Sequence, residues 1–261
     1  MNKQVGGEGT VAKAIEIMDI VVRFERAVRF SELLEVCPYP KATLHRFLQT
    51  LTQQGLLSYD DDRQLYAPGL HLARMGYRAW QHASLAPVAA PFLDALSAET
   101  GETLHLAQME NGNVVFVDKR KARVQFETLA RPGRLAPAHC TGVGKIMMAL
   151  MDEPRQFQAL ATQKFQKFTE HTLSTREELI AEFETIRDEG LAFDREEHED
   201  GVMSMAAPIL APSGKPIGAL SIVTATSRMD LDQLKALRPA LTRTTTQIGS
   251  EASNWPIPLA N

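Results

Sequence analysis

Residues Pro40–Leu57, PKATLHRFLQTLTQQGLL, decide the fold of the first part of this chain of 261 residues. Apolar side chains recur in it at the spacing of one helical face, at Leu44, Phe47, Leu48 and Leu51. Pro40 and Gly55 stand where a helix commonly begins and ends. The opposite face carries short or polar side chains: Ala42, Thr43, Arg46, Gln49, Thr50 and Gln53. We therefore predict an amphipathic helix with one buried stripe and a slim, uncharged-to-basic face that can meet a partner.

The segments beside this helix complete a larger unit. Apolar residues spaced from Val11 to Val22 predict a first helix, and a short second helix follows before the prolines of segment 37–40 end it. Two β-prone runs on either side of Asp60–Arg63 predict a hairpin after Gly55. Alone, the 40–54 helix is an ordinary amphipathic helix. Three helices and a hairpin in this order, however, indicate a winged helix-turn-helix, whose last helix enters the major groove of DNA.

Strands and helices are mixed in the rest of the chain, after a predicted linker helix over residues 70–86. Alternating apolar runs and turn residues predict strands at 103–109, 114–117, 123–129, 203–210 and 216–224. Helical spacing predicts helices at 90–98, 142–151, 176–189 and 231–250. The pattern indicates an α+β fold with a largely antiparallel sheet. We expect three parts: a DNA-binding domain at 1–69, a linker at 70–88 and a second domain at 89–261.

The composition is that of an ordinary globular protein, with 44% hydrophobic and 23% charged residues. The formal net charge is −4, so any contact with nucleic acid must depend on a few well-placed cations. No apolar run approaches the roughly 20 residues of a membrane helix, and the opening MNKQVGGEGT lacks the apolar core of a secretory signal. The two cysteines, Cys37 and Cys140, lie far apart, which suits a reducing compartment. We expect a cytoplasmic protein that does not contact a membrane.

Five short motifs, taken in order, resemble the IclR family of bacterial transcriptional regulators over roughly residues 10–250. They are GTVAKA at 9–14, PKATLHR at 40–46, TGET at 100–103, HCTGVGK at 139–145 and GLAFDREEHEDGVMSMAAP at 190–208. The resemblance implies a winged-helix domain, a linker helix and a GAF-like effector-binding domain. It also implies a homodimer, often paired into a homotetramer, which suits two recognition helices on a palindromic double-stranded operator.

By motif match, the resemblance implies that side chains of the 40–54 helix face DNA: Lys41, Thr43, His45, Arg46 and Gln49. Lys41 and Arg46 suit phosphates or guanine, whereas Thr43 and Gln49 suit bases or phosphates. His45 is equally compatible with a spacer on the helix surface. Ala42 stands where many relatives have serine, which removes one phosphate contact.

The resemblance also implies an effector pocket over the sheet of the second domain. The matching positions are Thr128, Ala136, His139, Gly142, Val143, Asp194, Val202, Ser204 and Ser221. Backbone N–H groups at the start of the 142–151 helix favour an anion, and the serines and His139 can donate hydrogen bonds. Asp194 would repel a carboxylate, so it suits a ligand hydroxyl or the orientation of a neighbour.

Two departures from the family pattern bear on the ligand. Ser204 occupies a place where relatives commonly carry cysteine, so a mechanism based on that thiol is absent. Thr128 and Ala136 are small where some relatives have leucine or methionine, which indicates a roomier pocket. The resulting hypothesis is a DNA-binding repressor or activator of a catabolic operon, controlled by a small carboxylate with an aromatic or otherwise bulky body.

Catalytic and metal-binding interpretations have weaker support. The charged run Asp194–Asp200 is typical of a solvated loop, and His139, Cys140 and His198 lack the spacing of a zinc site. No pairing of nucleophile and base follows from the spacing, so we expect no enzyme activity, no cofactor and no metal. The alternative is a metabolite-binding or catalytic α+β protein whose N-terminal helices mediate assembly.

Overall fold

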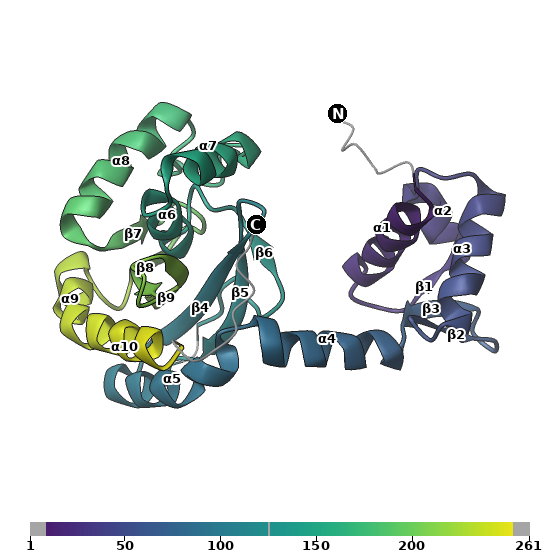
Figure 1. Cartoon of the computed structure of the whole chain (residues 1–261), viewed down its shortest axis with the longest axis horizontal. Coiled ribbons are helices and arrows are strands. Elements are labelled where there is room, and N and C mark those ends of the chain that lie inside the picture. Colours follow the sequence, from purple (N-terminus) through teal and green to yellow (C-terminus); the bar gives the residue numbers. More distant parts are fainter. Residues whose placement is uncertain (1–8, 125, 253–261) are drawn as a thin grey trace. The chain divides into compact units, whose positions relative to one another are not determined.

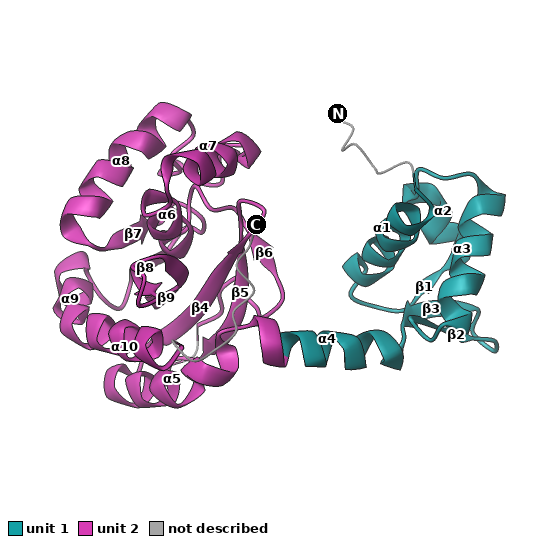
Figure 2. Ribbon diagram, viewed as in Figure 1, with its two compact units in different colours: residues 1–80 teal, residues 81–261 magenta. Residues whose placement is uncertain are grey.

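The computed structural model describes residues 9–124 and 126–252. Gln125 and the outermost parts of the two expected domains, residues 1–8 and 253–261, lie outside the described residues. Contacts divide the chain into two compact units, residues 1–80 and 81–261 (Figure 2). The division falls within the segment 70–88 that was expected to be the linker.

Unit 1 is a winged helix-turn-helix, as the order of its segments predicts (Figure 1). Its elements are α1 (Thr10–Arg23), β1 (Val28–Arg29), α2 (Phe30–Val36), α3 (Lys41–Gln53), β2 (Leu57–Asp60) and β3 (Leu65–Pro68). The strands pair antiparallel in the order β1-β3-β2. The apolar stripe of α3 is buried as predicted, in one cluster with Ile17 and Val21 of α1 and Leu33 of α2. This packing leaves the other face of α3 exposed.

Two helices follow the wing. α4 (Leu70–Ala83), all of whose residues are described, contains no buried residue although it is strongly amphipathic. Leu70, Met75 and Tyr77 are each more than half exposed. α5 (Ala86–Thr100) begins before the predicted residue 90, because Pro87 lies in its first turn, where a missing N–H breaks no helical hydrogen bond.

In the described part of unit 2, six strands form one antiparallel sheet in the order β6-β5-β4-β9-β8-β7. They are β4 (Thr103–Glu110), β5 (Asn113–Arg120), β6 (Leu135–Ala136), β7 (Ala192–Arg195), β8 (Val202–Leu210) and β9 (Pro216–Ala225). One face is covered by α6 (Gly142–Ala149), α7 (Glu153–Thr162) and α8 (Arg176–Glu189) (Figure 1). The other is covered by α5 and α10 (Arg238–Glu251), which the short α9 (Leu231–Ala236) precedes.

Several segments of unit 2 differ from the prediction. The described residues of 123–129 form no strand, because the Leu129 N–H donates to the Glu199 carboxylate (2.9 Å) and β6 pairs with β5 instead. The predicted final helix is split at Leu237, since the next helix, α10, carries a proline in its first turn. β1, β6, β7 and α7 were not predicted.

None of the helices in the described part of the chain combines the length and the hydropathy that a membrane span requires.

Candidate DNA-binding face and ligand cavity

α3 presents an exposed face opposite the stripe that it buries. Lys41, His45, Arg46 and Gln49 are exposed, and Thr43 is half-buried. At about 100° per residue, Arg46 and Gln49 lie near the middle of this face, whereas Lys41 and Thr43 lie at its two edges. No residue of α3 is acidic. The helix therefore presents two long hydrogen-bond donors, Arg46 and Gln49. It carries no carboxylate that would repel the phosphates of DNA.

Contacts with neighbours distinguish the members of this set. The His45 ring lies edge-on to Phe30 of α2, with centroids 6.0 Å apart. The Arg46 guanidinium lies 5.5 Å from the centroid of the Phe47 ring. Thr50 Oγ1 donates to the Arg46 carbonyl (3.0 Å), so its hydroxyl hydrogen is already used. Among these residues His45 thus has a packing role of its own, which fits the spacer interpretation.

The tip of the wing is acidic. Asp60, Asp61 and Asp62 follow one another at the end of β2 and are all exposed, together with Arg63. Asp60 Oδ1 accepts the N–H groups of Asp62 (3.1 Å) and Arg63 (3.0 Å), which closes the turn. The tip therefore holds three carboxylates against one guanidinium, so attraction to phosphate must come from other cations of unit 1.

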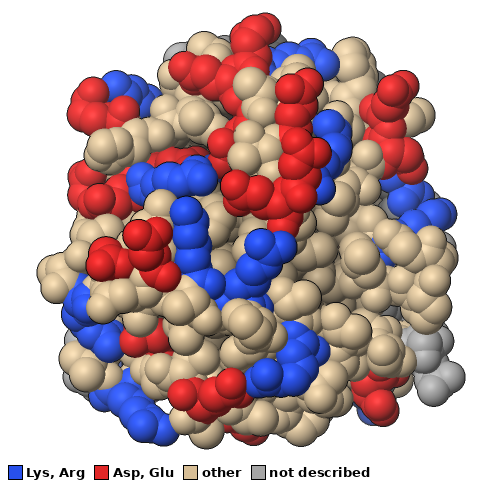
Figure 3. All heavy atoms as spheres, turned by 90° about the vertical axis from the view of Figure 1, so that its left-hand side faces the viewer, with Lys and Arg blue, Asp and Glu red and all other residues tan. Residues whose placement is uncertain are grey.

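Figure 3 shows acidic and basic side chains interspersed over the face of the molecule that it displays, with most of the acidic ones toward the top. That face is not a broad basic surface.

Unit 2 encloses a small cavity between the sheet and the N-terminus of α6. Antiparallel register assembles its walls: His105 of β4 lies opposite Ser221 of β9, and Asp194 of β7 lies opposite Ser204 of β8. The other lining residues are Phe116, Ala130, Thr141, Gly142, Val143, His198, Glu199, Val202 and Val223. The volume of this cavity is about 30 Å³, room for about one water molecule. A ligand with a ring needs these walls to separate.

The first turn of α6 directs uncapped N–H groups at this cavity. The N-cap residue, Thr141, donates its hydroxyl to the Pro137 carbonyl (3.0 Å) and leaves the helix without a side-chain cap. Gly142 lies so close to the sheet that a Cβ atom there would be 3.1 Å from Ser204 Oγ. The N–H groups of the first turn, with the hydroxyls of Ser204 and Ser221, make a neutral donor set that suits a small anion.

Titratable groups around this donor set are buried, and burial favours their neutral forms. Burial first, and then the neighbouring Glu197, raise the pKa of Asp194 to about 8, so at neutral pH this carboxyl is mostly protonated and can donate a hydrogen bond. Burial lowers the pKa of His105 to about 3 and the pKa of His198 to about 4. In its protonated form Asp194 therefore repels a ligand carboxylate less than an ionised aspartate would.

Lys119 places a cation behind the cavity wall. Its Nζ donates to Thr128 Oγ1 (2.8 Å) and to the Ala130 carbonyl (3.1 Å). Thr128 Oγ1 in turn lies 3.2 Å from His105 Nε2. Because Thr128 accepts from Lys119, its own hydrogen is available to His105 Nε2, which is then the unprotonated nitrogen of the ring. This chain of hydrogen bonds from Lys119 through Thr128 holds the His105 ring in the cavity wall.

A buried ion pair supports the same cavity from α6. Lys145 Nζ lies 2.5 Å from Glu197 Oε1 and 3.3 Å from Glu182 Oε1, and the Lys145 side chain is fully buried. The Glu197 N–H donates to Asp194 Oδ1 (2.8 Å). Lys145 thereby holds the segment after β7, from which His198 and Glu199 reach the cavity. The segment was predicted to be a solvated loop, but Glu197 is buried.

Most of the predicted effector residues meet in this cavity: Gly142, Val143, Asp194, Val202, Ser204 and Ser221. Thr128 is linked to it through His105. Ala136 packs in the core of unit 2, and His139 is buried with its Nε2 3.1 Å from the Gln166 carbonyl, so neither lines the cavity. Because Ala136 does not line the cavity, its small side chain does not widen it, contrary to the prediction of a roomier pocket.

Sequence reasoning missed several lining residues: His105, Phe116, Ala130, Thr141, His198, Glu199 and Val223. A signal existed for His105, a polar residue between two leucines of a predicted strand. Within residues 9–124 and 126–252, no three His, Cys, Asp or Glu side chains are arranged to hold a metal ion.

A winged helix-turn-helix and an α+β unit with a buried polar cavity are together the parts of a DNA-binding regulator that senses a small molecule. Two family models match the chain. The IclR helix-turn-helix domain matches residues 10–61, and the bacterial transcriptional regulator IclR C-terminal domain matches residues 77–250. The chain belongs to the IclR family of bacterial transcriptional regulators.

Individual relatives agree. The chain is 30% identical over 232 residues to the HTH-type transcriptional regulator KdgR of Dickeya chrysanthemi, which covers 89% of this chain and 76% of KdgR. It is 29% identical over 232 residues to the HTH-type transcriptional regulator XynR of Escherichia coli strain K12, covering 89% and 92% of the two chains. These relatives are named as regulators and not as enzymes, so the catalytic alternative is set aside.

Solved structures share the fold. The Thermotoga maritima IclR has a TM-score of 0.73 at 25% identity, over 94% of this chain and 98% of that chain. An IclR homolog from Microbacterium hydrocarbonoxydans, crystallised in complex with 4-hydroxybenzoate, has a TM-score of 0.79 at 20% identity, over 93% and 98% of the two chains.

Proposed function

We propose that this family member controls a catabolic operon from the cytoplasm, where the bacterial chromosome lies, and that its effector is a small carboxylate with an aromatic body. The observation that carries the proposal is the cavity below α6, where uncapped N–H groups, serine hydroxyls and the protonated Asp194 converge. An acid that binds in this cavity can then control the genes for the enzymes that break it down.

The proposed DNA contact uses the exposed face of α3. Arg46 and Gln49 point to base edges from the middle of the face, and Lys41 contacts phosphate at the N-terminal edge. Thr43 contacts phosphate from the other edge, and His45 holds α3 against α2. The exposure of these side chains and the absence of acidic residues from α3 support this arrangement.

A second copy of the chain completes the proposed DNA-binding form. The amphipathic α4 buries none of its residues, and Val11, Ile15 and Val22, which share one side of α1, are also exposed. Unpartnered apolar faces on unit 1 support a homodimer, in which two α3 helices read two half-sites of an operator. Two such dimers then pair in the homotetramer.

The proposed ligand pose follows from the walls of the cavity. The carboxylate lies at the first turn of α6, and the ring lies toward Phe116, Val202 and Val223. Entry of the ring requires the walls to separate, so binding selects an open form of unit 2. The effector then acts by population shift, favouring one spacing of the two recognition helices.

The test is fluorescence anisotropy of the full chain on its own upstream intergenic DNA at fixed salt, with and without benzoate, 4-hydroxybenzoate, acetate and pyruvate. We expect sequence-selective, salt-sensitive binding that only the aromatic acids change. A response to the smallest acids alone would sink the aromatic assignment. No preference over random DNA, with ligand binding retained, would favour the metabolite-binding alternative.

A further inference from the structure

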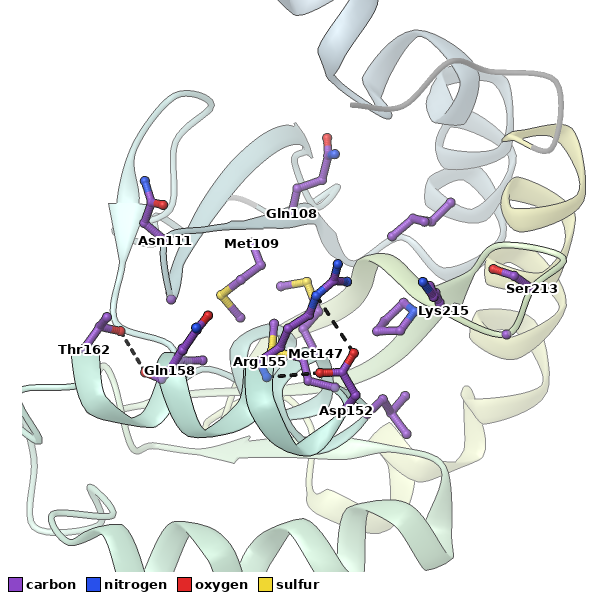
Figure 4. Close-up of a pocket in the computed structure, with 17 residues that line it drawn as sticks. Gln108, Met109, Asn111, Met147, Asp152, Arg155, Gln158, Thr162, Ser213 and Lys215 are labelled. Carbon is purple, nitrogen blue, oxygen red and sulfur yellow. Dashed lines mark hydrogen bonds and ion pairs between the residues drawn. The ribbon is translucent and has the colours of Figure 1, made fainter. Parts of the chain in front are cut away.

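A second pocket lies on unit 2 at the opposite end of α6 from the effector cavity. It is formed by the β4–β5 hairpin, the end of α6, α7 and the turn between β8 and β9 (Figure 4). Its volume of about 630 Å³ falls in the range of pockets that bury small molecules, about 300–1,000 Å³. As described, its lining shares no residue with the effector cavity.

The floor of this pocket is apolar and adaptable. Met109, Met147 and Met151 line it together with Ile217. Thioether side chains adjust to the shape of a ligand and make favourable contacts with aromatic rings. The described lining contains no aromatic side chain of its own, so the ring would come from the ligand.

The rim of the pocket is positively charged. Among the described lining residues the cations are Arg155 of α7 and Lys215 of the β8–β9 turn, and the only carboxylate is Asp152. Asp152 is engaged as the N-cap of α7, accepting the Arg155 N–H (3.0 Å), and its other oxygen lies 3.9 Å from Arg155 Nε. Figure 4 shows Arg155 directed toward the middle of the pocket, with Met109 to one side and Lys215 to the other.

We infer that this pocket is a second ligand site, for an amphipathic organic anion. A flat apolar body lies on the methionine floor, and a carboxylate lies between Arg155 and Lys215. Charge complementarity carries this choice, because the pocket gathers excess positive charge on a chain whose net charge is −4.

The coupling of this site to the effector cavity deepens the proposed function and rests on it. α6 has Gly142 and Val143 in the first cavity and Met147 in the second pocket, and all of its residues are buried. A closely packed helix of this length cannot move at one end alone. A ligand in the second pocket therefore changes effector affinity, and the effector changes the affinity of that ligand by the same factor.

The test is isothermal titration calorimetry of the full chain with 2-naphthoate, and with 2-naphthalenemethanol as the uncharged match. Arg155→Ala/Lys215→Ala removes the cations, and Gln158→Trp fills the pocket from an exposed position of α7. Lys164→Ala is the control, an exposed cation beyond α7 that is not in the lining. Gly142→Ala crowds the effector cavity only.

We expect the wild type and Lys164→Ala to bind naphthoate alike, and Gly142→Ala to bind it with an affinity shifted by the coupling through α6. The double variant should bind at least about tenfold more weakly, as loss of charge-assisted pairs implies. Gln158→Trp and the alcohol should each show weak or no binding. Equal binding by all variants, or a loss in Gly142→Ala without a loss in the double variant, would overturn the second site. A change of oligomeric state in Gln158→Trp would identify a surface between copies instead. Operator binding in the anisotropy assay reports on the proposed function separately.

Discussion

The Lys145 ammonium and the Glu197 carboxylate lie 2.5 Å apart with both side chains buried, and their pairing joins α6 to the segment that follows β7. The Glu197 carbonyl also accepts the Thr172 hydroxyl (2.6 Å), so Glu197 is held from two sides. Because Glu197 positions Asp194 and the cavity residues after it, this pair links the packing of unit 2 to its ligand chemistry.

Replacing Lys145 with methionine leaves the Glu197 carboxylate buried without its cation. We expect the free energy of unfolding of unit 2 to fall by about 3–5 kcal/mol, the cost of breaking a buried pair from one side. Urea denaturation of the full chain followed by circular dichroism measures it. Lys164→Met, at an exposed lysine, should stay within about 0.5 kcal/mol of wild type. Adding Glu197→Gln should recover part of the loss, and an unchanged loss in that double variant would contradict the account.

Asp194 gives unit 2 a dependence on pH. Its pKa rises from the usual value near 3.8 to about 8 on folding, so between these limits the folded state keeps a proton that the unfolded chain releases. The free energy of unfolding therefore decreases as pH rises through this window. Asp194→Asn, which never ionises, should flatten that part of the profile in urea denaturation at several pH values. Asp188→Asn, at an exposed carboxylate of α8, should leave the profile unchanged.

Gly142→Ala separates effector binding from folding. The added Cβ would lie 3.1 Å from Ser204 Oγ and 3.3 Å from Ala206 Cβ, at the donor end of the cavity. We expect effector affinity to fall about tenfold, because the ligand loses room beside its donors. The response of operator binding to the effector measures this. Gly144→Ala is the contrasting variant: its Cβ would lie 2.4 Å from the Ala138 carbonyl oxygen, so it should lose about 1–3 kcal/mol of stability instead.

Arg46→Ala should weaken operator binding by about 1–3 kcal/mol, the value of a bidentate base contact. Because the Arg46 side chain is exposed, the melting temperature of the protein should not change. Fluorescence anisotropy on operator and on random DNA separates base reading from charge. The matched control, Arg23→Ala, removes an exposed guanidinium from the end of α1 and should keep the preference for operator. If both variants lose the same affinity on both DNAs, Arg46 contributes charge only.

The parts of the fold that sequence reasoning predicted are those with local causes. α8 has the predicted bounds because Thr175 and Glu178 form a capping box and Gly190, with a φ of 68°, ends the helix. The hairpin after β4 was predicted from the residue pair Asn111 and Gly112, and both residues adopt the positive φ values that the turn requires. In contrast, β1 and β6 have two residues each, too few for any alternation to show.

The cavity depends on contacts between segments that lie far apart in the sequence. His105 lines it because the register of β4 with β9 places it opposite Ser221, and register is set by the whole sheet. The motif match placed Ala136 and His139 near the ligand by their position in the chain. The side chain of Ala136 turns into the core, and the His139 ring packs against Phe165.

The acidic tip of the wing affects how the protein searches a genome. Binding to DNA of arbitrary sequence is electrostatic, so carboxylates at Asp60–Asp62 beside a duplex weaken it at every position alike. The base contacts that we propose for α3 would be made at the operator alone. With about 10⁶–10⁹ competing sites in a genome, weaker background binding shortens the time spent away from the operator. The same penalty applies at the operator, so the ratio of operator to background affinity depends on the proposed base contacts of α3.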